Sequence, residues 1–371
     1  MKILLIANTA WNIWNFRRSL IDVLVREGFS VVCAAPPDPY QEKLQAITGA
    51  SFIPLQHLTR KGLSVWNNLR SFVELVQLMR RERPALVVCY TVKPNIFGSL
   101  AARIAGIPVI ASVEGQGYTA TASSLFRFFI FLLYRLAFRF VRRVIFLNHD
   151  DKREFLQHKA VAADKTIVIT GTGIDTELFK PVSRLQSTPP VFLFIGRLLS
   201  DKGIREFVQA ATIVKQSEPH VRFQVLGSTD EGNPASIAEA ELQHWIEQQH
   251  IDYLGYSDDV RPFIANAGAV VLPSYREGMP RVLLEGMAMG KPVITTDSVG
   301  CRDTVEDGIN GFIVPSENAA ALAEAMLSFI RLDPAEQLAM SRYSRYKAEK
   351  KFSNDRVLPQ YLRVIRSASG A

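Results

Sequence analysis

Two glutamates, Glu277 and Glu285, stand eight residues apart with a predicted helix start between them. Pro280 suits the first turn of a helix, where its missing N–H costs nothing, and Gly290 suits the helix end. Residues 293–296 then form an apolar run typical of a buried strand. A helix start carries free N–H groups that attract anions, and carboxylates accept hydrogen bonds from sugar hydroxyls. The stretch therefore predicts a site that holds a phosphate beside a polyol, which is the composition of a sugar nucleotide.

The residues between the two glutamates belong to the same predicted donor site. Two glutamates around a helix start can also be a dipole-favoured first turn and a solvated helix face. Leu283 and Leu284 favour the binding-site interpretation over the solvated face, because they give the helix a buried face. The predicted donor contacts next to Glu277 are Gly278, Met279, Pro280, Arg281 and Val282.

A second stretch, GRLLSDKG at 196–203, places two cations after a predicted strand at 191–195. Arg197 leaves the strand, and Lys202 precedes the glycine at which the next helix begins. Cations at this position can neutralise the charge that develops on a departing diphosphate. A lone Arg and Lys can also be simply a pair of surface side chains near a turn, with no role at a leaving group. The chain contains no Asp-x-Asp sequence that would hold Mg²⁺, so we expect Arg197 and Lys202 to stabilise the leaving group without a metal.

Strand-like runs alternate with helical patterns along the chain, which is typical of parallel sheets with helices on both faces. The predicted strands are residues 2–7, 31–34, 52–54, 86–90, 109–113, 144–147 and 167–170, then 191–195, 223–226, 253–254, 270–273, 293–295 and 311–314. A polar stretch rich in Pro and Ser at 180–190 is the predicted linker. A chain of 371 residues is too long for one typical core. We therefore predict doubly wound domains at 1–182 and 183–350, followed by a C-terminal helix at 351–371.

Composition excludes several classes of protein. Hydrophobic residues make up 48% and charged residues 21%, as in globular rather than disordered proteins. Cys33, Cys89 and Cys301 are widely spaced, so neither a disulfide framework nor a zinc site is expected. The first ten residues are better explained as a buried strand than as a signal peptide, because a helical pattern follows at once. We expect a cytoplasmic protein.

The positive charge is concentrated in the first half of the chain. Residues 1–182 carry 23 Lys and Arg against 13 Asp and Glu, and the remainder carries 20 against 23. The first half should therefore face an anionic partner. No RNA-binding or helix-turn-helix signature is present, so nucleic acid is not expected.

A membrane surface is the predicted anionic partner, and the predicted contact is an arginine-rich helix at 123–146. Its apolar residues are interrupted by five arginines that fall within roughly 160° of a helical wheel: Arg127, Arg135, Arg139, Arg142 and Arg143. The longest uncharged run, 128–134, is far short of the ~20 residues that span a bilayer. A core helix with solvated arginines is the alternative, but such an aromatic and basic helix suits the membrane interface.

The two motifs of the second half resemble those of the retaining glycosyltransferases of family 4. EGMPRVLLE is similar to the family's E-x7-E motif, and GRLLSDKG is similar to its G-R-x4-K-G diphosphate site. The resemblance covers most of the chain and implies the GT-B fold, two Rossmann-like doubly wound domains facing a central cleft. It also implies front-face departure of the diphosphate with Arg197 and Lys202 stabilising it. Glu277 would hold the donor sugar, Glu285 the ribose, and Gly196 would belong to the donor site.

The first half departs from the family pattern in ways that concern the acceptor. The first loop of the family is glycine-rich, whereas residues 8–12 contain no glycine. Glu114 and Gly115 stand where many members have His-Gly. Lys93 follows a strand, where it can meet an acceptor phosphate. With Asn12, these residues form the predicted acceptor site, and the combination resembles family members that act on undecaprenyl-diphosphate-linked sugars.

The sequence thus predicts a retaining, metal-independent glycosyltransferase. It would transfer a hexose or N-acetylhexosamine from a UDP-sugar to a polyprenyl-diphosphate-linked saccharide during bacterial surface or glycoprotein glycan assembly, on the inner face of the cytoplasmic membrane. The nucleotide sugar is a substrate, and no cofactor is expected. Two alternatives are a GT-B-like sugar-nucleotide epimerase, which needs no membrane helix, and a non-enzymatic sugar-binding protein, which would need export.

Overall fold

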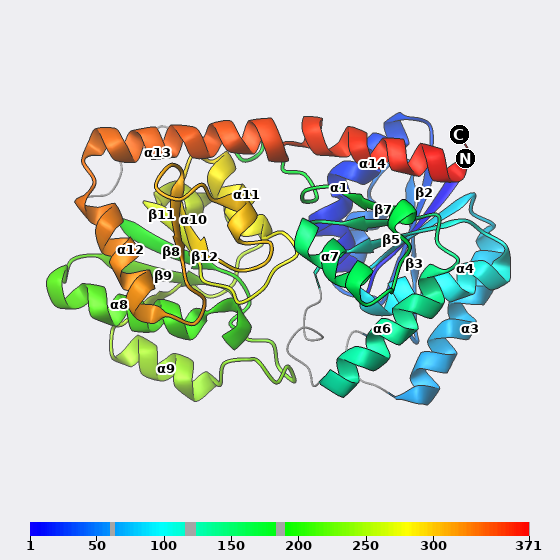
Figure 1. Ribbon diagram of the computed structural model, residues 1–371, viewed down its shortest axis with the longest axis horizontal. Coiled ribbons are helices and arrows are strands. Elements are labelled where there is room, and N and C mark those ends of the chain that lie inside the picture. Colours follow the sequence, from blue (N-terminus) through cyan, green and yellow to red (C-terminus); the bar gives the residue numbers. More distant parts are fainter. Residues whose placement is uncertain (60–63, 116–123, 183–189, 371) are drawn as a thin grey trace. The chain divides into compact units, whose positions relative to one another are not determined.

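The computed structural model describes residues 1–59, 64–115, 124–182 and 190–370 (Figure 1). The chain divides into two compact units. Unit 1 consists of Met1–Gly173 and Asn354–Ala371, and unit 2 consists of Ile174–Ser353. Most of the predicted linker, residues 183–189, lies outside the described residues. The domain boundary predicted at 182/183 therefore stays a prediction.

Unit 1 is built on a seven-stranded parallel sheet with the order β3-β2-β1-β4-β5-β6-β7. The strands are β1 (Lys2–Ile6), β2 (Ser30–Ala35), β3 (Ala50–Pro54), β4 (Leu86–Tyr90), β5 (Val109–Val113), β6 (Arg143–Phe146) and β7 (Thr166–Val168). Leu4 of β1 lies opposite Val32 on one side and Val87 on the other. Central strands of such a sheet are covered on both faces, which explains why they are continuous apolar runs in the sequence.

Helices cover both faces of this sheet. They are α1 (Ala10–Arg26), α2 (Gln41–Gln45), α3 (Val65–Glu82), the π-helical turn η1 (Pro94–Gly98), α4 (Ser99–Ala105), α6 (Ser124–Phe138), α7 (His149–Gln157), η2 (Ala163–Lys165) and α14 (Asn354–Ser369). One hydrophobic core joins the sheet to α1, α2 and α14. The other core joins the opposite face to α3, α4, α6 and α7, and Figure 1 shows α1 and α14 on the other side of the sheet from α3, α4 and α6.

The last helix of the chain belongs to unit 1. α14 packs on α1, and the Tyr361 hydroxyl donates to the carbonyl of Gly171 at 3.1 Å. Arg366 near its end forms an ion pair with Glu27 at the end of α1. The apolar stripe of α14 therefore completes the core of unit 1.

Unit 2 contains a six-stranded parallel sheet with the order β10-β9-β8-β11-β12-β13. Its strands are β8 (Val191–Ile195), β9 (Arg222–Leu226), β10 (Asp252–Tyr253), β11 (Ala269–Leu272), β12 (Val293–Thr296) and β13 (Gly311–Val314). Its helices are η3 (Ser200–Lys202), α8 (Ile204–Ser217), α9 (Glu239–Glu247), α10 (Arg261–Asn266), α11 (Arg281–Ala288), η4 (Arg302–Thr304), α12 (Ala319–Arg331), α13 (Pro334–Lys347) and η5 (Ala348–Phe352). The prediction of two doubly wound parallel sheets is confirmed.

The arginine-rich helix is shorter than predicted. α6 ends at Phe138, and Arg139 lies in the turn that follows. Arg143 is the first residue of β6, where it lies opposite Ile110 of β5. Arg127 forms an ion pair with Glu154 of α7 at 2.5 Å. The prediction that five arginines share one helix face is therefore wrong, because sheet pairing takes over where the helical pattern was extended.

No helix within residues 1–59, 64–115, 124–182 and 190–370 is long and apolar enough to cross a membrane.

We expect unit 2 to gain stability as the pH rises from about 8 to 10.5, because of Lys291. Burial lowers the pKa of the Lys291 amine to about 8 from 10.5, although its Nζ donates to the carbonyl of Ala265 at 2.9 Å. Between these two pH values the unfolded chain binds more protons than the folded one, so the free energy of unfolding rises with pH. Lys291→Met should raise that free energy at pH 7 by about 1 kcal/mol, allowing for partial exposure. It should also flatten the rise in urea unfolding series between pH 7 and 10. Equal pH slopes for variant and parent would contradict the argument.

Candidate active site

The two predicted leaving-group cations follow β8. The turn between them and α8 packs against the end of β11, the neighbouring strand, at Gly203. Gly203 has a φ of +73°, and a Cβ at this position would lie 2.1 Å from the carbonyl oxygen of Pro273. Only glycine fits there, so the turn that carries Lys202 is held against the loop that follows β11.

Glu277 lies in that loop and is held by two side chains. Lys202 donates to its Oε1, and Ser274 Oγ donates to the same oxygen at 2.8 Å. The side chain of Glu277 is only 14% exposed, and that of Lys202 is 21% exposed. The predicted leaving-group cation and the predicted sugar-binding carboxylate thus form one ion pair within unit 2.

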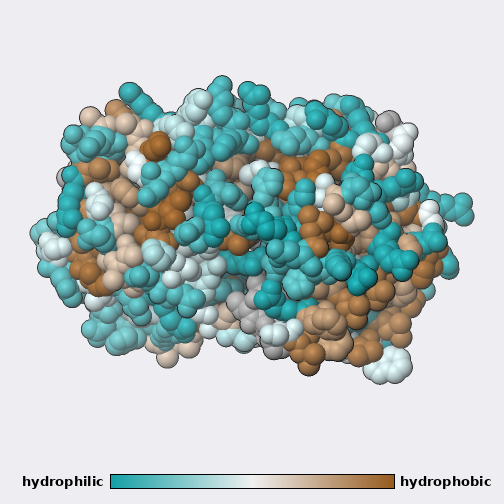
Figure 2. Space-filling model, viewed as in Figure 1, coloured by the Kyte–Doolittle hydropathy of each residue, from teal (hydrophilic) through white to brown (hydrophobic). Residues whose placement is uncertain are grey.

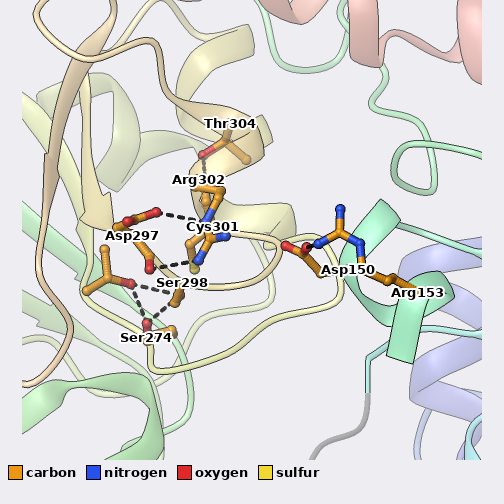
Figure 3. Close-up of polar contacts among 9 residues, drawn as sticks. Asp150, Arg153, Ser274, Asp297, Ser298, Cys301, Arg302 and Thr304 are labelled. Carbon is orange, nitrogen blue, oxygen red and sulfur yellow. Dashed lines mark hydrogen bonds and ion pairs between the residues drawn. The ribbon is translucent and has the colours of Figure 1, made fainter. Parts of the chain in front are cut away.

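The loop after β12 supports this pair from a third strand. Thr296 Oγ1 and Ser298 Oγ donate to the carbonyl of Ser274 at 2.5 and 2.9 Å, as Figure 3 shows for Ser298 and Ser274. At Gly300 a Cβ would lie 2.4 Å from the carbonyl oxygen of Glu277. Burial raises the pKa of the neighbouring Cys301 thiol to about 11, and the charge of Glu277 adds to that rise. Cys301 is therefore a neutral packing residue and not a nucleophile.

The same loop is closed by polar contacts of its own. Figure 3 shows Arg302 reaching back to Asp297, with its Nε 2.8 Å from the carboxylate, and Thr304 donating to the carbonyl of Cys301 at 2.7 Å. These contacts give the segment between β12 and η4 a defined path past Ser274.

Arg197 is oriented by a carboxylate that the sequence analysis did not identify. Its guanidinium forms an ion pair at 2.6 Å with Asp230, on the loop after β9. Asn233 donates to the same carboxylate at 3.0 Å. The side chain of Arg197 remains 47% exposed while that of Asp230 is 10% exposed. Asp230 therefore anchors one edge of a guanidinium that an anion can still approach.

Glu285 lies inside α11, as predicted, and pairs with the preceding turn of its own helix. Arg281 Nε donates to its Oε1 at 2.8 Å. Burial raises the pKa of the Glu285 carboxyl, and the Arg281 charge offsets part of that rise. Pro280 is the N-cap of α11, one residue before the helix, and supplies no side-chain cap. The start of α11 therefore has no side-chain cap, and the Leu283 N–H donates to the carbonyl of Pro280 at 3.1 Å.

The predicted acceptor residues of unit 1 lie at the carboxyl ends of three neighbouring strands. Asn12 is in the first turn of α1 after β1, where its N–H donates to the capping Thr9. Lys93 follows β4, and Glu114 and Gly115 follow β5. Because β1, β4 and β5 are adjacent and parallel, these residues share one edge of the sheet.

The segment after β4 has two unusual features. Thr91 has a φ of +66°, a left-handed conformation that β-branched residues rarely adopt. Burial lowers the pKa of the nearby Lys93 amine, and its Nζ donates to Thr59 Oγ1 at 3.1 Å. Backbone strain of this kind is concentrated at functional sites, which supports the assignment of this edge to ligand binding.

Glu114 is held by an arginine whose role was not predicted. Arg17 of α1 is 1% exposed and forms an ion pair with Glu114. Its guanidinium also lies 4.2 Å from the ring centre of Tyr90 and 5.9 Å from that of Tyr361 on α14. The sequence carried a signal for it, because Arg17 shares the helical period of the buried residues of α1. Asp230 had no such signal, since its partner Arg197 is 33 positions away in the chain. Ser274 was not predicted either, although it lies only three residues before Glu277.

Within the described parts of both units, no group of three His, Cys, Asp or Glu residues is arranged to hold a metal ion.

Known families match both halves of the chain. The family described as Glycosyl transferase 4-like matches residues 2–148, and the family described as Glycosyl transferases group 1 matches residues 189–331. A similar protein is the N,N'-diacetylbacillosaminyl-diphospho-undecaprenol alpha-1,3-N-acetylgalactosaminyltransferase of Campylobacter jejuni. It is 30% identical over 99% of this chain and 100% of its own length. The UDP-Gal:alpha-D-GlcNAc-diphosphoundecaprenol alpha-1,3-galactosyltransferase of Escherichia coli is 25% identical over 82% of this chain and 81% of its own.

The fold is shared with solved glycosyltransferase structures. The Anabaena protein Alr3699/HepE, solved with UDP-glucose, superposes with a TM-score of 0.82 at 22% identity, covering 99% of this chain and 100% of that one. Two Rossmann-like parallel-sheet units with these neighbours define the GT-B class of glycosyltransferase. The chain belongs to glycosyltransferase family 4, as its resemblance implied. It is a glycosyltransferase, and the relatives favour transfer over the epimerase and sugar-binding alternatives.

Proposed function

We propose that this glycosyltransferase transfers a hexose or N-acetylhexosamine from a UDP-sugar to a polyprenyl-diphosphate-linked saccharide, with retention of the anomeric configuration. The observation that carries the proposal is the Lys202–Glu277 ion pair, which joins the turn after β8 to the loop after the neighbouring strand β11. In the proposal, Lys202 and Arg197 are the cations for the diphosphate and Glu277 is the carboxylate for the sugar hydroxyls. The names of the two relatives add a diphospho-undecaprenol acceptor, and that of the E. coli protein adds a UDP-sugar donor.

The proposed mechanism uses charge stabilisation on the donor side. As the bond from the anomeric carbon to the diphosphate breaks, the electron pair goes to the diphosphate oxygen, where Lys202 and Arg197 stabilise it. The acceptor hydroxyl attacks from the same face and gives its proton to the departing phosphate. Glu277 accepts hydrogen bonds from Lys202 and Ser274 at its Oε1 atom. Its Oε2 atom would then accept a hydrogen bond from a sugar hydroxyl. Glu285 would accept from the ribose.

Retention is supported by the relatives. Both names specify an α-1,3 linkage, and one names UDP-galactose, whose sugar is itself α-linked to the diphosphate. A product with the configuration of the donor requires front-face transfer or a double displacement. Front-face transfer needs no protein base, whereas a double displacement would need a nucleophile.

The site of action that we propose is the inner face of the cytoplasmic membrane, because a polyprenyl-linked acceptor is confined to a bilayer. The exposed arginines Arg135, Arg139, Arg142 and Arg143 remain the proposed contacts to anionic lipid. Arg127 is a weaker candidate, since its partner is Glu154.

A transfer assay tests the proposal. The protein is incubated with UDP-galactose, UDP-glucose and their N-acetylated forms, with and without an undecaprenyl-diphosphate-linked saccharide, and the product linkage is determined by NMR. We expect an α-linked product only when the acceptor is present. Epimerised donor without acceptor would favour the epimerase alternative, and a β-linked product would contradict retention.

An arm of the same assay in excess EDTA tests metal independence. We expect turnover to persist, because Lys202 and Arg197 supply the positive charge at the leaving group. Loss of turnover that Mg²⁺ restores would contradict this part of the proposal.

A further inference from the structure

The solvent-facing side of α6 is apolar. Six large hydrophobic residues recur on it at helical spacing and are at least 37% exposed: Leu125, Phe128, Phe129, Leu132, Leu133 and Leu136. The opposite side, with Phe131, Tyr134 and Phe138, is buried in the core of unit 1. A surface helix normally turns polar residues to water. α6 therefore has a second apolar side that the fold of unit 1 does not use.

The helix α3 extends this apolar side. Val65, Trp66, Leu69 and Val73 are 78%, 73%, 50% and 45% exposed. α3 and α6 cover the same face of the sheet, and α4 contacts both of them. Figure 2 shows hydrophobic surface gathered over α3 and α6, at the lower right of the view. We call these ten residues of α3 and α6 the apolar surface. Exposed patches of this kind mark interaction sites.

Basic residues border the apolar surface. Arg135 lies within α6, while Arg139, Arg142 and Arg143 follow its end, and all four are exposed. Among the described residues, none of the four takes part in an ion pair. Apolar and aromatic residues beside exposed arginines are typical of protein surfaces that lie in the interface of an anionic bilayer.

We propose that the apolar surface of α3 and α6 inserts into the headgroup region of an anionic phospholipid bilayer, with the four arginines contacting the lipid phosphates. The inference rests on the proposed function for its biological sense, since it would hold unit 1 at the bilayer that contains the acceptor. A second copy of the chain would also cover apolar side chains. The arginines of that second copy would then approach these four arginines. The excess positive charge of residues 1–182 in both copies opposes such a contact.

Vesicle co-sedimentation of a matched pair of variants tests the proposal. The test variant is Trp66→Gln, Phe128→Gln, Phe129→Gln and Leu132→Gln, because glutamine keeps the helices favourable. The control is Ile213→Gln and Leu338→Gln, two exposed apolar residues of unit 2. We expect the test variant to bind phosphatidylcholine–phosphatidylglycerol vesicles about a hundredfold more weakly, and the control to bind as the parent does. High salt should weaken parental binding only in part, because screening removes the arginine contribution and not the apolar one.

The parent itself provides a second readout through Trp66. Brominated lipids should quench part of its tryptophan fluorescence, and Trp66→Phe should remove that part. This measurement holds even if the fourfold variant fails to fold. The absence of any Trp66 quenching, or equal binding of test variant and parent, would overturn the proposal. A parental dimer that the test variant dissociates, without vesicle binding by either, would assign the surface to a second copy instead.

Transfer to a short-chain, water-soluble acceptor separates this inference from the proposed function. The test variant should retain that turnover and lose turnover on vesicle-borne acceptor. If the parent binds vesicles but transfers no sugar to any acceptor, the proposed function fails and the docking surface stands. If it transfers sugar without binding vesicles, the docking surface fails alone.

Discussion

Lys202→Ala should lower kcat about a hundredfold, corresponding to ~3 kcal/mol of lost transition-state stabilisation. Negative charge on the diphosphate is greatest as the glycosidic bond breaks, so the loss should appear in kcat more than in the KM for the donor. Arg197→Ala should have an effect of the same kind. Steady-state kinetics with varied UDP-sugar, together with calorimetric binding of UDP, measure the two contributions separately.

The control for these variants is Arg205→Ala. Arg205 lies in the same unit and pairs with Glu241 at 2.7 Å, as Arg197 pairs with Asp230. Its removal should leave kcat and KM within about twofold of the parent, because an exposed ion pair contributes little. If Lys202→Ala matched Arg205→Ala in both constants, Lys202 would have no part in the reaction.

Arg17→Met should destabilise unit 1 by about 3 kcal/mol, because it leaves the Glu114 carboxylate without its buried partner. Arg17 is 1% exposed and Glu114 has a side chain 14% exposed, so water replaces the lost contact poorly. The variant also loses the contacts of the guanidinium with Tyr90 and Tyr361. Urea unfolding followed by circular dichroism should give a lower midpoint.

Two further variants separate the ion pair from the general effect of losing an arginine. Arg18→Met removes the neighbouring arginine, which is 41% exposed and pairs with Asp22, and should change the free energy of unfolding by less than about 0.5 kcal/mol. Arg17→Met with Glu114→Gln should recover much of the lost stability, since no uncompensated charge remains. An Arg17→Met protein that unfolds like the Arg18→Met protein would show that the buried pair does not stabilise unit 1. The acceptor KM of Glu114→Gln alone reports on the contact proposed for Glu114.

The strands and both motifs of unit 2 were predictable from local sequence. Buried parallel strands such as 86–90 are apolar runs that no surface element resembles. The placement of Glu277 and Glu285 could be predicted because their spacing depends only on local features, namely a loop, a helix start and a helix turn. A strand was predicted at 144–147, but the end of α6 was not, because residues 139–143 fit the helical wheel and become turn and strand only through pairing with β5.

The sequence by itself was enough to propose which residues carry chemistry: Arg197, Lys202, Glu277 and Glu285 are recognisable from type and spacing. Only the tertiary structure decided how they are partnered. Asp230 reaches Arg197 and Lys202 reaches Glu277 because β9, β8 and β11 are neighbours in the sheet, although the paired residues are 33 and 75 positions apart. The tertiary structure also decided which side of α6 faces solvent, because the apolar residues of this helix recur with the period of any core helix. Which of its two apolar sides is buried depends on where the sheet lies, and that is a property of the folded unit.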